Sequence, residues 1–495
     1  MAVFRRQQSM CRLILLIAIS AMTLAPAAQA RDDDRPYGTP PEFEGQLASL
    51  AAINIRNAEL EIVIDGLDEP WAIEFLDSEE ALITERRGRL LRVAVSLTDE
   101  SSLSEITGLP EIATMHQQTG LLDLALHPEF EENRLIYFSY AEPDPDTGRY
   151  FRTQVARARL EANRLHDVRV LLPDGEYGWS PSNFGGALWF DRHGRLLISM
   201  GDRSEDVLSQ RGERLEGKIL RLHDDGSVPP DNPFIDDPKI DDRILALGVR
   251  NVQGMMRDPE GSEIYMTDHG PLGGDEINVL KAGANYGWPR ITYGLAYSTA
   301  PMGEGTHAEG LIQPIFYYLP SEAISPLLVY RGRMFPEWNG DLLIGALKGQ
   351  HVSRLDLDGG RIRSEYPLLD EIGSRIRDLK TAADGAVWIL TQDGDLLRLS
   401  RTEPLAPAKR TPNGERVYQL VCAGCHDTGA ADAPRLDEAC RWRRLAQRPV
   451  ESLYRNTLNG IGNMPERGLC YSCSEEHLFR AVDYMLEAAE ECETP

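Results

Sequence analysis

Five consecutive residues near the C-terminus, Cys422-Ala423-Gly424-Cys425-His426, form the most specific chemical motif in the sequence. The pattern CxxCH is the attachment signature of a c-type haem. The thiols of Cys422 and Cys425 are expected to form thioethers with the porphyrin vinyl groups, and His426 to bind the iron. A redox-active or zinc-binding CxxC followed by an incidental histidine is the alternative interpretation. The motif predicts that this part of the chain carries electrons.

A second iron ligand is expected further along the chain. Met464 lies in Gly460-Ile461-Gly462-Asn463-Met464-Pro465, a run of Gly and Pro that can present a thioether to a metal. A methionine ligand raises the potential of a haem and is common in electron carriers. A methionine of the apolar core is the alternative. We predict Met464 as the sixth ligand.

The cysteines are confined to the C-terminal part of the chain. Of the seven, Cys11 lies in the N-terminal segment, and the other six follow residue 420. The four that do not belong to CxxCH are Cys440, Cys470, Cys473 and Cys492. An even number fits an oxidising compartment, and we expect a bridge between Cys440 and Cys492. A zinc ribbon is the rival, but the two CxxC motifs are further apart than the usual ~15–20 residues.

The N-terminus predicts export. Residues 1–30 combine Arg5, Arg6 and Arg12 with an apolar run and an Ala-Gln-Ala cleavage site, as in a secretory signal peptide. We expect the general secretory route rather than the twin-arginine route, and a periplasmic protein. No later stretch reaches the ~18 apolar residues of a spanning helix, so no membrane span is predicted.

The charge balance excludes one class of partner. The net charge of the 495-residue chain is −26, and loss of the three signal arginines would bring it to −29. Nucleic acid is not expected as a partner, because its phosphates would be repelled. One basic run stands out, namely Arg441, Arg443, Arg444 and Arg448. It is interpreted either as a docking site for an acidic electron partner or as a contact with haem propionates or solvent.

Two kinds of element must position these residues. Between about residues 60 and 400, a turn with Asp, Gly or Asn is followed by a short apolar strand at 75–86, 127–140, 190–202, 257–270, 335–347 and 381–394. Six such units predict an all-β domain, a six-bladed β-propeller over 60–400. Residues 31–59 are expected to be a flexible leader and 401–411 a linker. In 412–495 we expect a small all-α domain, with helical spacing of apolar residues over 475–489.

The C-terminal segment resembles the short class I bacterial cytochromes c. It has a CxxCH near its start, a GxxxMP loop and a C-terminal helix. The run 464–485 resembles a subgroup that carries a further CxxC after the methionine. The resemblance implies that Cys470 and Cys473 form a small disulfide.

The propeller segment resembles the soluble sugar dehydrogenases of glucose/sorbosone type that depend on pyrroloquinoline quinone (PQQ). The resemblance rests on motifs in this order: GLDEPW at 66–71, HQQTGLLDLALHPEF at 116–130, GVRNVQG at 248–254, DHGPLGGDEIN at 268–278, NYGWP at 285–289, GALKGQ at 345–350 and SRIRDL at 374–379. Each motif is weak alone, but their number and order are specific.

The resemblance implies a set of cofactor ligands. PQQ carries three carboxylates and an ortho-quinone, and such an anion needs several fixed cations. By resemblance, Lys348, Arg375 and Arg377 hold the carboxylates, and Arg250 and Asn251 contact the quinone oxygens. For any one of these arginines alone, a surface ion pair would be the ordinary explanation.

The resemblance also implies a metal ion and further residues around the substrate. The backbone carbonyls of Gly270 and Pro271 would bind a Ca²⁺, which prefers oxygen ligands and acts as a Lewis acid on the quinone. Gln118, Asp202 and Arg250 are expected beside the substrate. For Asp202, a simple turn residue is the alternative.

One position departs from the family pattern. Family enzymes carry a histidine before the segment matched by Phe184-Gly185-Gly186, and it takes the proton from the substrate hydroxyl. This chain has Asn183 there, preceded by Ser182. A neutral amide is not a general base near neutral pH, whereas an imidazole is. The substitution calls the sugar chemistry into question but not the binding of the cofactor. Asp202, in the family-like GDR turn at 201–203, is a candidate to act as the base instead. A more acidic or differently placed substrate is the alternative.

Three functions are therefore compared. The first is a periplasmic quinohaemoprotein dehydrogenase that oxidises a sugar or an alcohol and passes electrons through its own haem to a respiratory cytochrome or oxidase. Tethering the haem raises its effective concentration near the reduced quinol. The second is a catalytically impaired propeller that binds PQQ or carbohydrate and serves as a binding or relay module. The third, a Ca²⁺-dependent lactonase-type hydrolase, rests on fold analogy alone.

Overall fold

The structure is a computed structural model, and it describes residues 58–95, 102–116, 118–369, 372–401, 414–469 and 475–487. The predicted signal peptide, residues 31–57 of the predicted leader and residues 402–411 of the predicted linker lie outside the described residues. The same holds for Cys470, Cys473 and Cys492.

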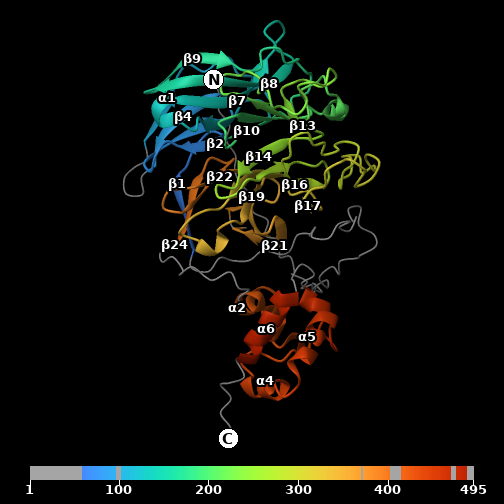
Figure 1. Ribbon diagram of the computed structural model, residues 1–495. Helices are drawn as coiled ribbons and strands as arrows, with labels where there is room; N and C mark the ends of the chain where they lie inside the picture. Colours follow the sequence, from blue (N-terminus) through green and yellow to red (C-terminus); the bar gives the residue numbers. More distant parts are fainter. Residues whose placement is uncertain are drawn as a thin grey trace, which may run out of the picture.

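Six four-stranded antiparallel sheets form the larger part of the molecule. Figure 1 shows them around a common centre, with the helical segment outside the ring. Blade 1 contains β2 (Pro70–Phe75), β3 (Glu80–Glu85), β4 (Arg89–Ala94) and β5 (Leu103–Ile106). Blade 2 contains β6 (Leu121–Leu126), β7 (Leu135–Pro143), β8 (Phe151–Glu161) and β9 (Arg164–Val170). Blade 3 contains β10 (Gly185–Phe190), β11 (Leu196–Met200), β12 (Lys218–Leu222) and β13 (Ile244–Leu247).

The other three blades follow in the same order along the chain. Blade 4 contains β14 (Val252–Arg257), β15 (Ile264–Asp268), β16 (Asp275–Val279) and β17 (Phe316–Tyr318). Blade 5 contains β18 (Ile324–Val329), β19 (Leu342–Ala346), β20 (Val352–Asp358) and β21 (Arg361–Leu368). Blade 6 contains β22 (Ile376–Thr381), β23 (Val387–Thr391), β24 (Leu396–Arg401) and, outermost, β1 (Ala58–Ile64). Short helical turns are α1 (Phe130–Asn133), η1 (Asp206–Gln210) and η2 (Pro336–Trp338).

The ring is closed by both ends of the propeller segment. The first strand, β1, pairs with β24 of the last blade, with Ala58 opposite Arg401. The innermost strands of adjacent blades contact one another all the way around, including β22 against β2. The apolar core lies between blades, since Leu82 and Leu90 of blade 1 pack in one cluster with Ile136 and Phe138 of blade 2.

Neighbouring blades are joined by buried hydroxyl groups on their second strands. Ser139 Oγ on β7 accepts a hydrogen bond from Asp123 N (3.0 Å) and donates to Gly186 O of blade 3 (2.7 Å). Hydroxyls of neighbouring blades also donate to the next innermost strand, namely Thr84 to Leu122 O, Ser199 to Val252 O and Thr267 to Ser325 O. All four side chains are fully buried. Each therefore fixes one blade against the next, in addition to the apolar packing between the blades.

The predicted propeller is confirmed. Each of the six predicted units contains the turn between the first two strands of one blade, for example 190–202 between β10 and β11. The strands extend from Ala58 to Arg401. The sequence pattern predicts the blades correctly because one hairpin of each blade is buried on both faces. The second strand of that hairpin must therefore be apolar.

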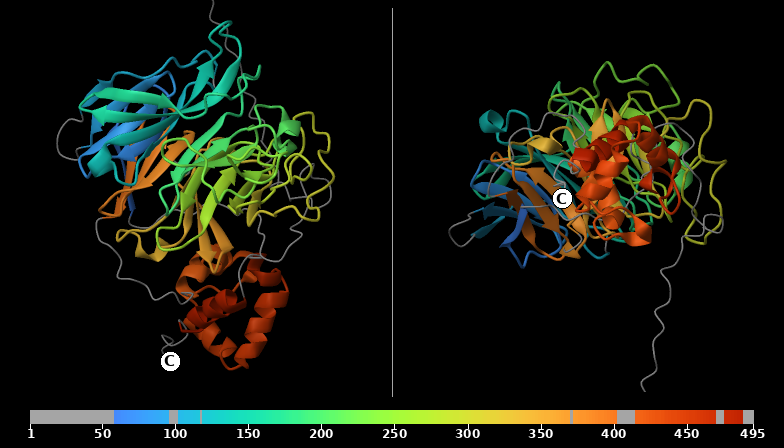
Figure 2. Two further views of the ribbon diagram at one scale, coloured as in Figure 1. Left: turned by 45° about the horizontal axis from the view of Figure 1, so that its top comes forward. Right: turned by 90° about the horizontal axis from the view of Figure 1, so that it is seen from below.

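The C-terminal segment is a small helical unit (Figure 2). Its elements are α2 (Gly414–Val417), the π-helical turn η4 (Tyr418–Cys422), α3 (Ala423–His426), η5 (Ala430–Asp432), α4 (Ala439–Leu445), α5 (Val450–Asn459), η6 (Glu466–Leu469) and α6 (Glu475–Glu487). The helix predicted over 475–489 is confirmed as α6. It packs against α2, where Leu478 and Val482 share a core with Val417 and Trp442.

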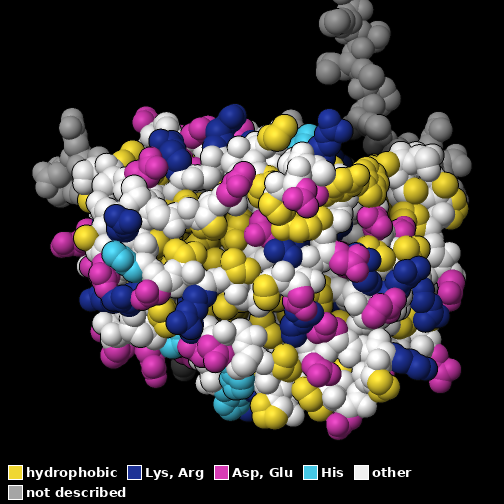
Figure 3. All heavy atoms as spheres, turned by 90° about the horizontal axis from the view of Figure 1, so that it is seen from above, with side chains coloured by type: hydrophobic (Ala, Val, Ile, Leu, Met, Phe, Trp, Pro, Cys, Tyr) yellow, Lys and Arg dark blue, Asp and Glu magenta, His cyan; other side chains and the backbone are white. Residues whose placement is uncertain are grey.

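The surface carries both signs of charge. On the side shown in Figure 3, acidic and basic side chains alternate with apolar ones over the whole face. Within the described ranges, none of the helices has the length and apolar character needed to cross a membrane.

Candidate functional site

The predicted site residues of the propeller gather at one end of the ring. In each blade the first strand starts at this end and the antiparallel second strand returns to it. Residues just before a first strand are Gln118, Asn183, Arg250, Asn251 and Arg375. Residues just after a second strand are Asp202, Gly270, Pro271 and Lys348, while Arg377 is the second residue of β22. We call this end of the ring the site end.

Asn183 is held in a fixed orientation. Its side-chain nitrogen Nδ2 donates to Asp202 Oδ1 (2.9 Å), and its backbone N–H donates to Gln118 Oε1 (2.8 Å). The residue is 7% exposed and has a φ of 53°. Asparagine and histidine are both enriched in this left-handed region. The amide oxygen of Asn183 is therefore the atom left to meet a ligand.

Asp202 positions Asn183 rather than meeting a substrate itself. Its side chain is 1% exposed. Oδ1 also accepts from Ser204 N (2.8 Å), and Oδ2 accepts from Trp288 Nε1 (2.9 Å). The prediction that Asp202 lies beside the substrate stays a prediction; the structure shows its carboxylate in contact with the amide of Asn183.

Glycines allow the close approach of the two loops that carry these residues. A Cβ on Gly201 would lie 2.0 Å from Asn183 O, and one on Gly185 would lie 2.6 Å from Gly201 N. Gly185 also has a φ of 65°, which a side chain disfavours. Any larger residue at either position would push Asn183 away from Asp202.

Arg250 and Asn251 are fixed by the buried carboxylate of Asp268. Its two oxygens accept the backbone N–H groups of Arg250 (2.8 Å) and Asn251 (2.6 Å). The Arg250 guanidinium lies over the Trp288 ring, with 5.5 Å from Cζ to the ring centroid. Asn251 Oδ1 accepts from Gly185 N (3.0 Å), which links blade 4 to the loop of Asn183.

Arg375 and Arg377 share one neutral partner. Arg375 Nε and Arg377 Nη2 both donate to Gln392 Oε1, at 2.8 and 2.7 Å. Arg377 stacks on Trp71 at 4.1 Å, and its Nε is buried without a partner among the described residues. Burial, together with the charges of Arg375 and Arg86, lowers the pKa of Arg377 to about 9.

Among the described residues, no carboxylate forms an ion pair with the cationic side chains predicted to bind the cofactor. Over the part of the chain that the structure describes, no Asp or Glu oxygen lies within 4.0 Å of the side-chain nitrogens of Arg250, Arg375, Arg377 or Lys348. Lys348 Nζ instead donates to the carbonyl of Ser321 (3.0 Å). Like charges brought together without a counter-ion are costly unless an anion binds there. A tricarboxylate such as PQQ fits this donor set.

His269 is a member of the site that sequence reasoning missed. Burial, Arg250 and Arg377 lower its pKa to about 3, so the imidazole is neutral. Its Nε2 is buried and has no hydrogen-bond partner among the described residues. His269 belongs to the DHGP run, but nothing local in the sequence indicates that Arg250, Arg375 and Arg377 lie near it.

The predicted calcium ligands are in part already engaged. The Gly270 carbonyl accepts a hydrogen bond from Arg250 Nη1 (3.2 Å), and Gly270 N donates to Asp275 Oδ1 (2.8 Å). Asp275 is buried and also accepts from Ser321 Oγ (2.8 Å). The Gly270 carbonyl is therefore held in place, and a carbonyl oxygen with one hydrogen bond keeps a second lone pair for a cation.

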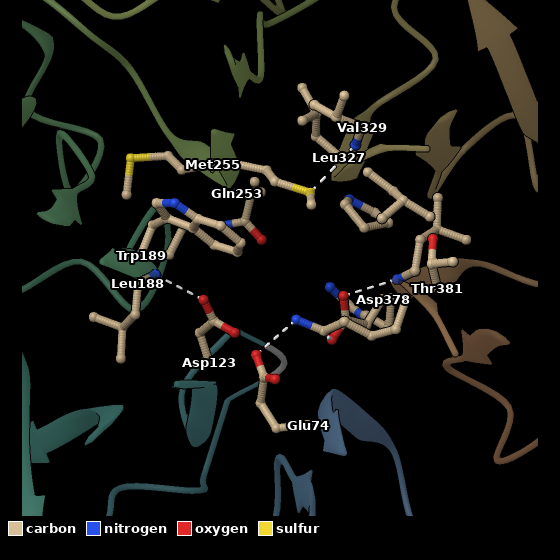
Figure 4. A pocket seen from close by; sticks show the side chains of 18 of the residues that line it. Glu74, Asp123, Leu188, Trp189, Gln253, Met255, Leu327, Val329, Asp378 and Thr381 are labelled. Carbon is tan, nitrogen blue, oxygen red and sulfur yellow. Dashed lines mark hydrogen bonds and ion pairs between the residues drawn. The ribbon is translucent and has the colours of Figure 1, made fainter. Parts of the chain in front are cut away.

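A cavity of about 490 Å³ occupies the centre of the ring and is lined by Trp71 and Arg377 of the site end (Figure 4). Glu74, Asp123 and Asp378 point into it from three blades. Lys380 Nζ lies 2.7 Å from Glu74 and 3.9 Å from Asp378. Burial and the charge of Asp378 raise the pKa of Asp123 to about 7.

The CxxCH motif runs from the last residue of η4 through α3. His426 is 7% exposed, and its Nδ1 lies 2.8 Å from the Pro434 carbonyl. Nδ1 thus donates to this carbonyl, which leaves Nε2 free for a metal. The Cys422 thiol is buried, the Cys425 thiol is exposed, and neither is in a disulfide.

The Met464 loop lies on the same small domain. Backbone hydrogen bonds join Ile461 and Met464 in both directions (3.0 and 2.9 Å). In the turn that follows, Gly468 packs against Val421, the residue before Cys422. Cys440 is disulfide-bonded. Since Cys492 lies outside the described residues, the Cys440–Cys492 pairing stays a prediction, as does the Cys470–Cys473 bridge.

Comparison with known proteins assigns both parts of the chain. The family described as "Glucose / Sorbosone dehydrogenase" matches residues 67–398, which is more than half of the chain. The chain belongs to this family. A second family, described as "Cytochrome C oxidase, cbb3-type, subunit III", matches residues 409–485. The protein is an aldose sugar dehydrogenase-like propeller followed by a cytochrome c domain, which implies haem c.

Relatives of the glucose/sorbosone dehydrogenase family cover the whole propeller. Aldose sugar dehydrogenase YliI of Escherichia coli is 36% identical over 358 residues, which are 71% of this chain and 94% of that protein. The crystal structure of the E. coli soluble aldose sugar dehydrogenase in the apo form matches with a TM-score of 0.64 over 70% of this chain and 99% of that one, at 36% identity. Quinoprotein glucose dehydrogenase B of Acinetobacter calcoaceticus is 28% identical over 306 residues, 57% of this chain and 60% of that protein.

The cytochrome domain has its own relatives. Cytochrome c5 of Azotobacter vinelandii is 31% identical over 75 residues, which are 15% of this chain and 90% of that protein. The expectation of a sugar dehydrogenase-type propeller joined to a cytochrome c is therefore confirmed, and the chain is of oxidoreductase type.

Proposed function

We propose that this protein is a periplasmic quinohaemoprotein that oxidises a sugar or an alcohol with PQQ and passes the electrons through its own haem to a respiratory cytochrome or oxidase. The observation that supports it best is the group of arginines at the site end, which have no carboxylate partner among the described residues. A group of fixed cations that contact no carboxylate is what an anionic cofactor requires.

Each residue of the site end has a distinct part in this proposal. Lys348, Arg375 and Arg377 would bind the PQQ carboxylates, and Arg250 and Asn251 the quinone oxygens. The carbonyls of Gly270 and Pro271 would bind Ca²⁺. When bound, PQQ supplies an ortho-quinone able to accept two electrons.

Asn183 binds and orients a substrate hydroxyl but does not remove its proton. With Nδ2 committed to Asp202, its amide oxygen can accept one hydrogen bond from that hydroxyl. The Asp202 carboxylate is buried and already accepts three hydrogen bonds, so it is not available to take the proton instead. Proton removal is therefore slower than in an enzyme with an imidazole at this position.

The same residue favours a second candidate function. A propeller that binds PQQ or a sugar without turnover would keep the arginine set and the Asn183–Asp202 contact and would have no need of a base. This binding or relay module remains the competing proposal.

Periplasmic location is part of the proposal. A covalently attached haem and the disulfide at Cys440 both suit an oxidising compartment. Residues 1–30, which carry the predicted signal, lie outside the described part of the structure.

The deciding experiment measures reduction of the haem iron. Purified, haem-loaded protein is reconstituted with Ca²⁺ and PQQ, and the ferrous absorption band is recorded on addition of sugars and alcohols. Reduction that requires both PQQ and one class of substrate supports the dehydrogenase. Tight PQQ binding, measured by titration, without reduction by any substrate supports the binding module instead.

A further inference from the structure

The cavity at the centre of the ring extends from the site end to the opposite end. Besides Trp71 and Arg377 of the site end, its lining includes Pro259 and Ala383. These two residues lie in the turns that follow the first strands of blades 4 and 6, at the far end of the ring, and both are exposed. The cavity therefore reaches from the predicted cofactor site to the surface on the other side. We call it the central channel.

Charged side chains line one side of the central channel. Glu74 on β2, Asp123 on β6 and Asp378 on β22 point into it (Figure 4). The side chains of Glu74, Asp378 and Lys380 are 21%, 14% and 22% accessible to solvent, although their strands are innermost in the blades. Their accessible surface therefore faces the channel. Since a water molecule takes about 30 Å³ in the liquid, a polar channel of about 490 Å³ has room for a chain of them.

Gln253 connects the central channel to a residue expected at the quinone. Its Nε2 donates to Asn251 Oδ1 and to the Gly185 carbonyl, both at 3.3 Å. The same side chain lines the channel (Figure 4). Asn251 is a predicted contact of the quinone oxygens. A polar group thus lies between the predicted position of the quinone and the carboxylates of the channel.

Asp123 is the carboxylate whose affinity for a proton suits exchange near neutral pH. Its two oxygens accept the backbone N–H groups of Leu124 (2.9 Å) and Leu188 (2.7 Å). Burial and the charge of Asp378 raise its pKa to about 7, against the opposing effect of Lys380. A group with such a pKa takes up and releases a proton with similar ease at neutral pH.

The other carboxylates around Asp123 are held in ion pairs. Glu74 and Lys380 are 2.7 Å apart, and Asp378 lies 3.9 Å from the same lysine. The strands next to β6 add no free charge, since β10 has no charged residue and the carboxylates of β3 and β7 contact arginines; these are Glu80, Glu85 and Glu142. Of the three carboxylates of the channel, Asp123 is thus the one with no lysine or arginine nitrogen within 4.0 Å among the described residues.

The charges of the molecule favour movement of a proton away from the site end. Four cations gather there without a carboxylate within 4.0 Å in the described ranges, namely Arg250, Lys348, Arg375 and Arg377. The middle of the central channel has three carboxylates and one lysine. A proton released at the site end is therefore repelled by the first group and attracted by the second.

The proposed reaction releases protons that the haem does not take. Oxidation of the bound quinol back to the quinone gives up two electrons and two protons. The haem iron accepts the electrons singly, as Fe³⁺ becomes Fe²⁺, and passes them to the external acceptor. Both protons must therefore reach solvent by a separate route.

We propose that the central channel is this route, and that Asp123 receives protons from the site end and passes them through water to the surface at Pro259 and Ala383. This assignment rests on the proposed function for the source of the protons. The connection of Asp123 to solvent at the far end is a property of the chain alone and can be measured without the cofactor.

The first test needs neither PQQ nor turnover. In the haem-loaded, full-length protein, the infrared band of protonated carboxyl groups is titrated, and the difference between wild type and Asp123→Asn reports Asp123. The band is expected to titrate at about pH 7 and to shift on mixing with D₂O. Ala383→Trp, which narrows the far end, is expected to slow the shift about tenfold, because exchange must then wait for local opening. Ala162→Trp, in the exposed β8–β9 turn at the same end, is the control.

The second test measures the electrons that leave together with the protons. PQQ reduced beforehand to its quinol is added with Ca²⁺, and haem reduction is followed by stopped-flow absorbance, so neither a sugar nor a base at Asn183 is needed. Asp123→Asn and Ala383→Trp are expected to slow reduction about tenfold or more, and Asp123→Glu to restore it. The wild-type rate should rise with pH through about 7, and that of Asp123→Asn should not. A sample without Ca²⁺ gives the contribution of unbound quinol.

The outcomes separate the two proposals. Exchange in Ala383→Trp as fast as in wild type, or reduction by the quinol as fast in Asp123→Asn, overturns the proton route and leaves the proposed function intact. Slowed exchange and slowed reduction by the quinol, with no reduction by any sugar or alcohol, support the route and remove the proposed dehydrogenase. A bound quinol that never reduces the haem overturns both.

Discussion

At the scale of single residues, the site end combines fixed side chains with an asparagine where the family pattern has a histidine. The side chain of Asn183 is oriented by the hydrogen bond that it donates to Asp202. The amide lacks only the basicity of an imidazole. Its φ of 53° suits either residue, so the substitution changes chemistry without changing the backbone.

The first prediction concerns that position. Asn183→His is expected to raise kcat/KM for the preferred sugar at least tenfold, because general base catalysis contributes about 10²–10⁴-fold. The rate should rise with pH through about 6–7, where an imidazole loses its proton. Initial rates of haem reduction between pH 5 and 9 check this, with Asn183→Gln as the neutral control. A pH-independent rate equal to that of the wild type would contradict it.

The second prediction concerns the uncompensated arginines. Arg377→Met is expected to weaken PQQ binding by about 10–100-fold, as hydrogen bonds to charged groups contribute about 1.5–3 kcal/mol. Fluorescence titration with PQQ and Ca²⁺ measures the affinity. The matched control is Arg195→Met, because Arg195 is paired with Asp191 and Asp231 away from the site end. Equal affinities of the two variants would remove Arg377 from the site.

At the scale of elements, the hairpin is the unit that positions function. The turn before each first strand and the turn after each second strand meet at the site end, and buried hydroxyls fix that geometry from blade to blade. The Asn183 loop follows blade 2 directly and begins blade 3. Loosening the contact between these two blades is therefore expected to disturb the position of Asn183.

The third prediction tests one of these hydroxyls. Ser139→Ala leaves the Asp123 N–H and the Gly186 carbonyl without their partner, and is expected to lower the free energy of unfolding by about 2 kcal/mol. Urea unfolding followed by circular dichroism measures it. Ser227→Ala, in an exposed turn, is the control and should change stability by less than about 0.5 kcal/mol. A loss equally small for Ser139→Ala would refute the role of the hydroxyl.

At the scale of the whole molecule, the ring is closed by charge as well as by strand pairing. β22 of the last blade contributes Asp378 and Lys380, which bind Ile73 N (2.8 Å) and Glu74 (2.7 Å) on β2 of the first blade. Burial lowers the pKa of Lys380, but Asp378, Glu74 and Asp123 outweigh it and raise that pKa overall. Lys380 therefore stays charged among the three carboxylates.

The fourth prediction follows from this closure. Lys380→Met is expected to destabilise the propeller by about 3 kcal/mol, since it leaves buried carboxylates without their cation. Unfolding is measured at pH 5 and pH 8, with the exposed Lys239→Met as control.

The raised pKa values of two carboxylates determine at which pH Lys380→Met loses more stability. The pKa of Asp123 is about 7 and that of Asp378 about 6, both raised first by burial. The stability that such raised groups contribute is complete below about pH 4, the pKa of an aspartate in an unfolded chain, and is lost as pH rises through 6–7. Lys380→Met should therefore lose more stability at pH 8 than at pH 5. A loss that is the same at both values would contradict the assignment of the charged cluster.

The sequence by itself determined the elements and the kind of chemistry. The six hairpins, the helix α6 and the haem motif at Cys422, Cys425 and His426 are local patterns, because strand alternation, helical spacing and CxxCH depend only on near neighbours. The order of the family motifs predicts Arg250, Lys348, Arg375 and Arg377 as one group of ligands.

Only the tertiary structure decided which residues meet across blades. The approach of His269 to Arg377 and the hydrogen bond from Trp288 to Asp202 both join segments far apart in the chain. No local pattern encodes such contacts, because they arise when six separate hairpins are brought around one axis. Burial and charge at those points, and hence binding, follow from that arrangement alone.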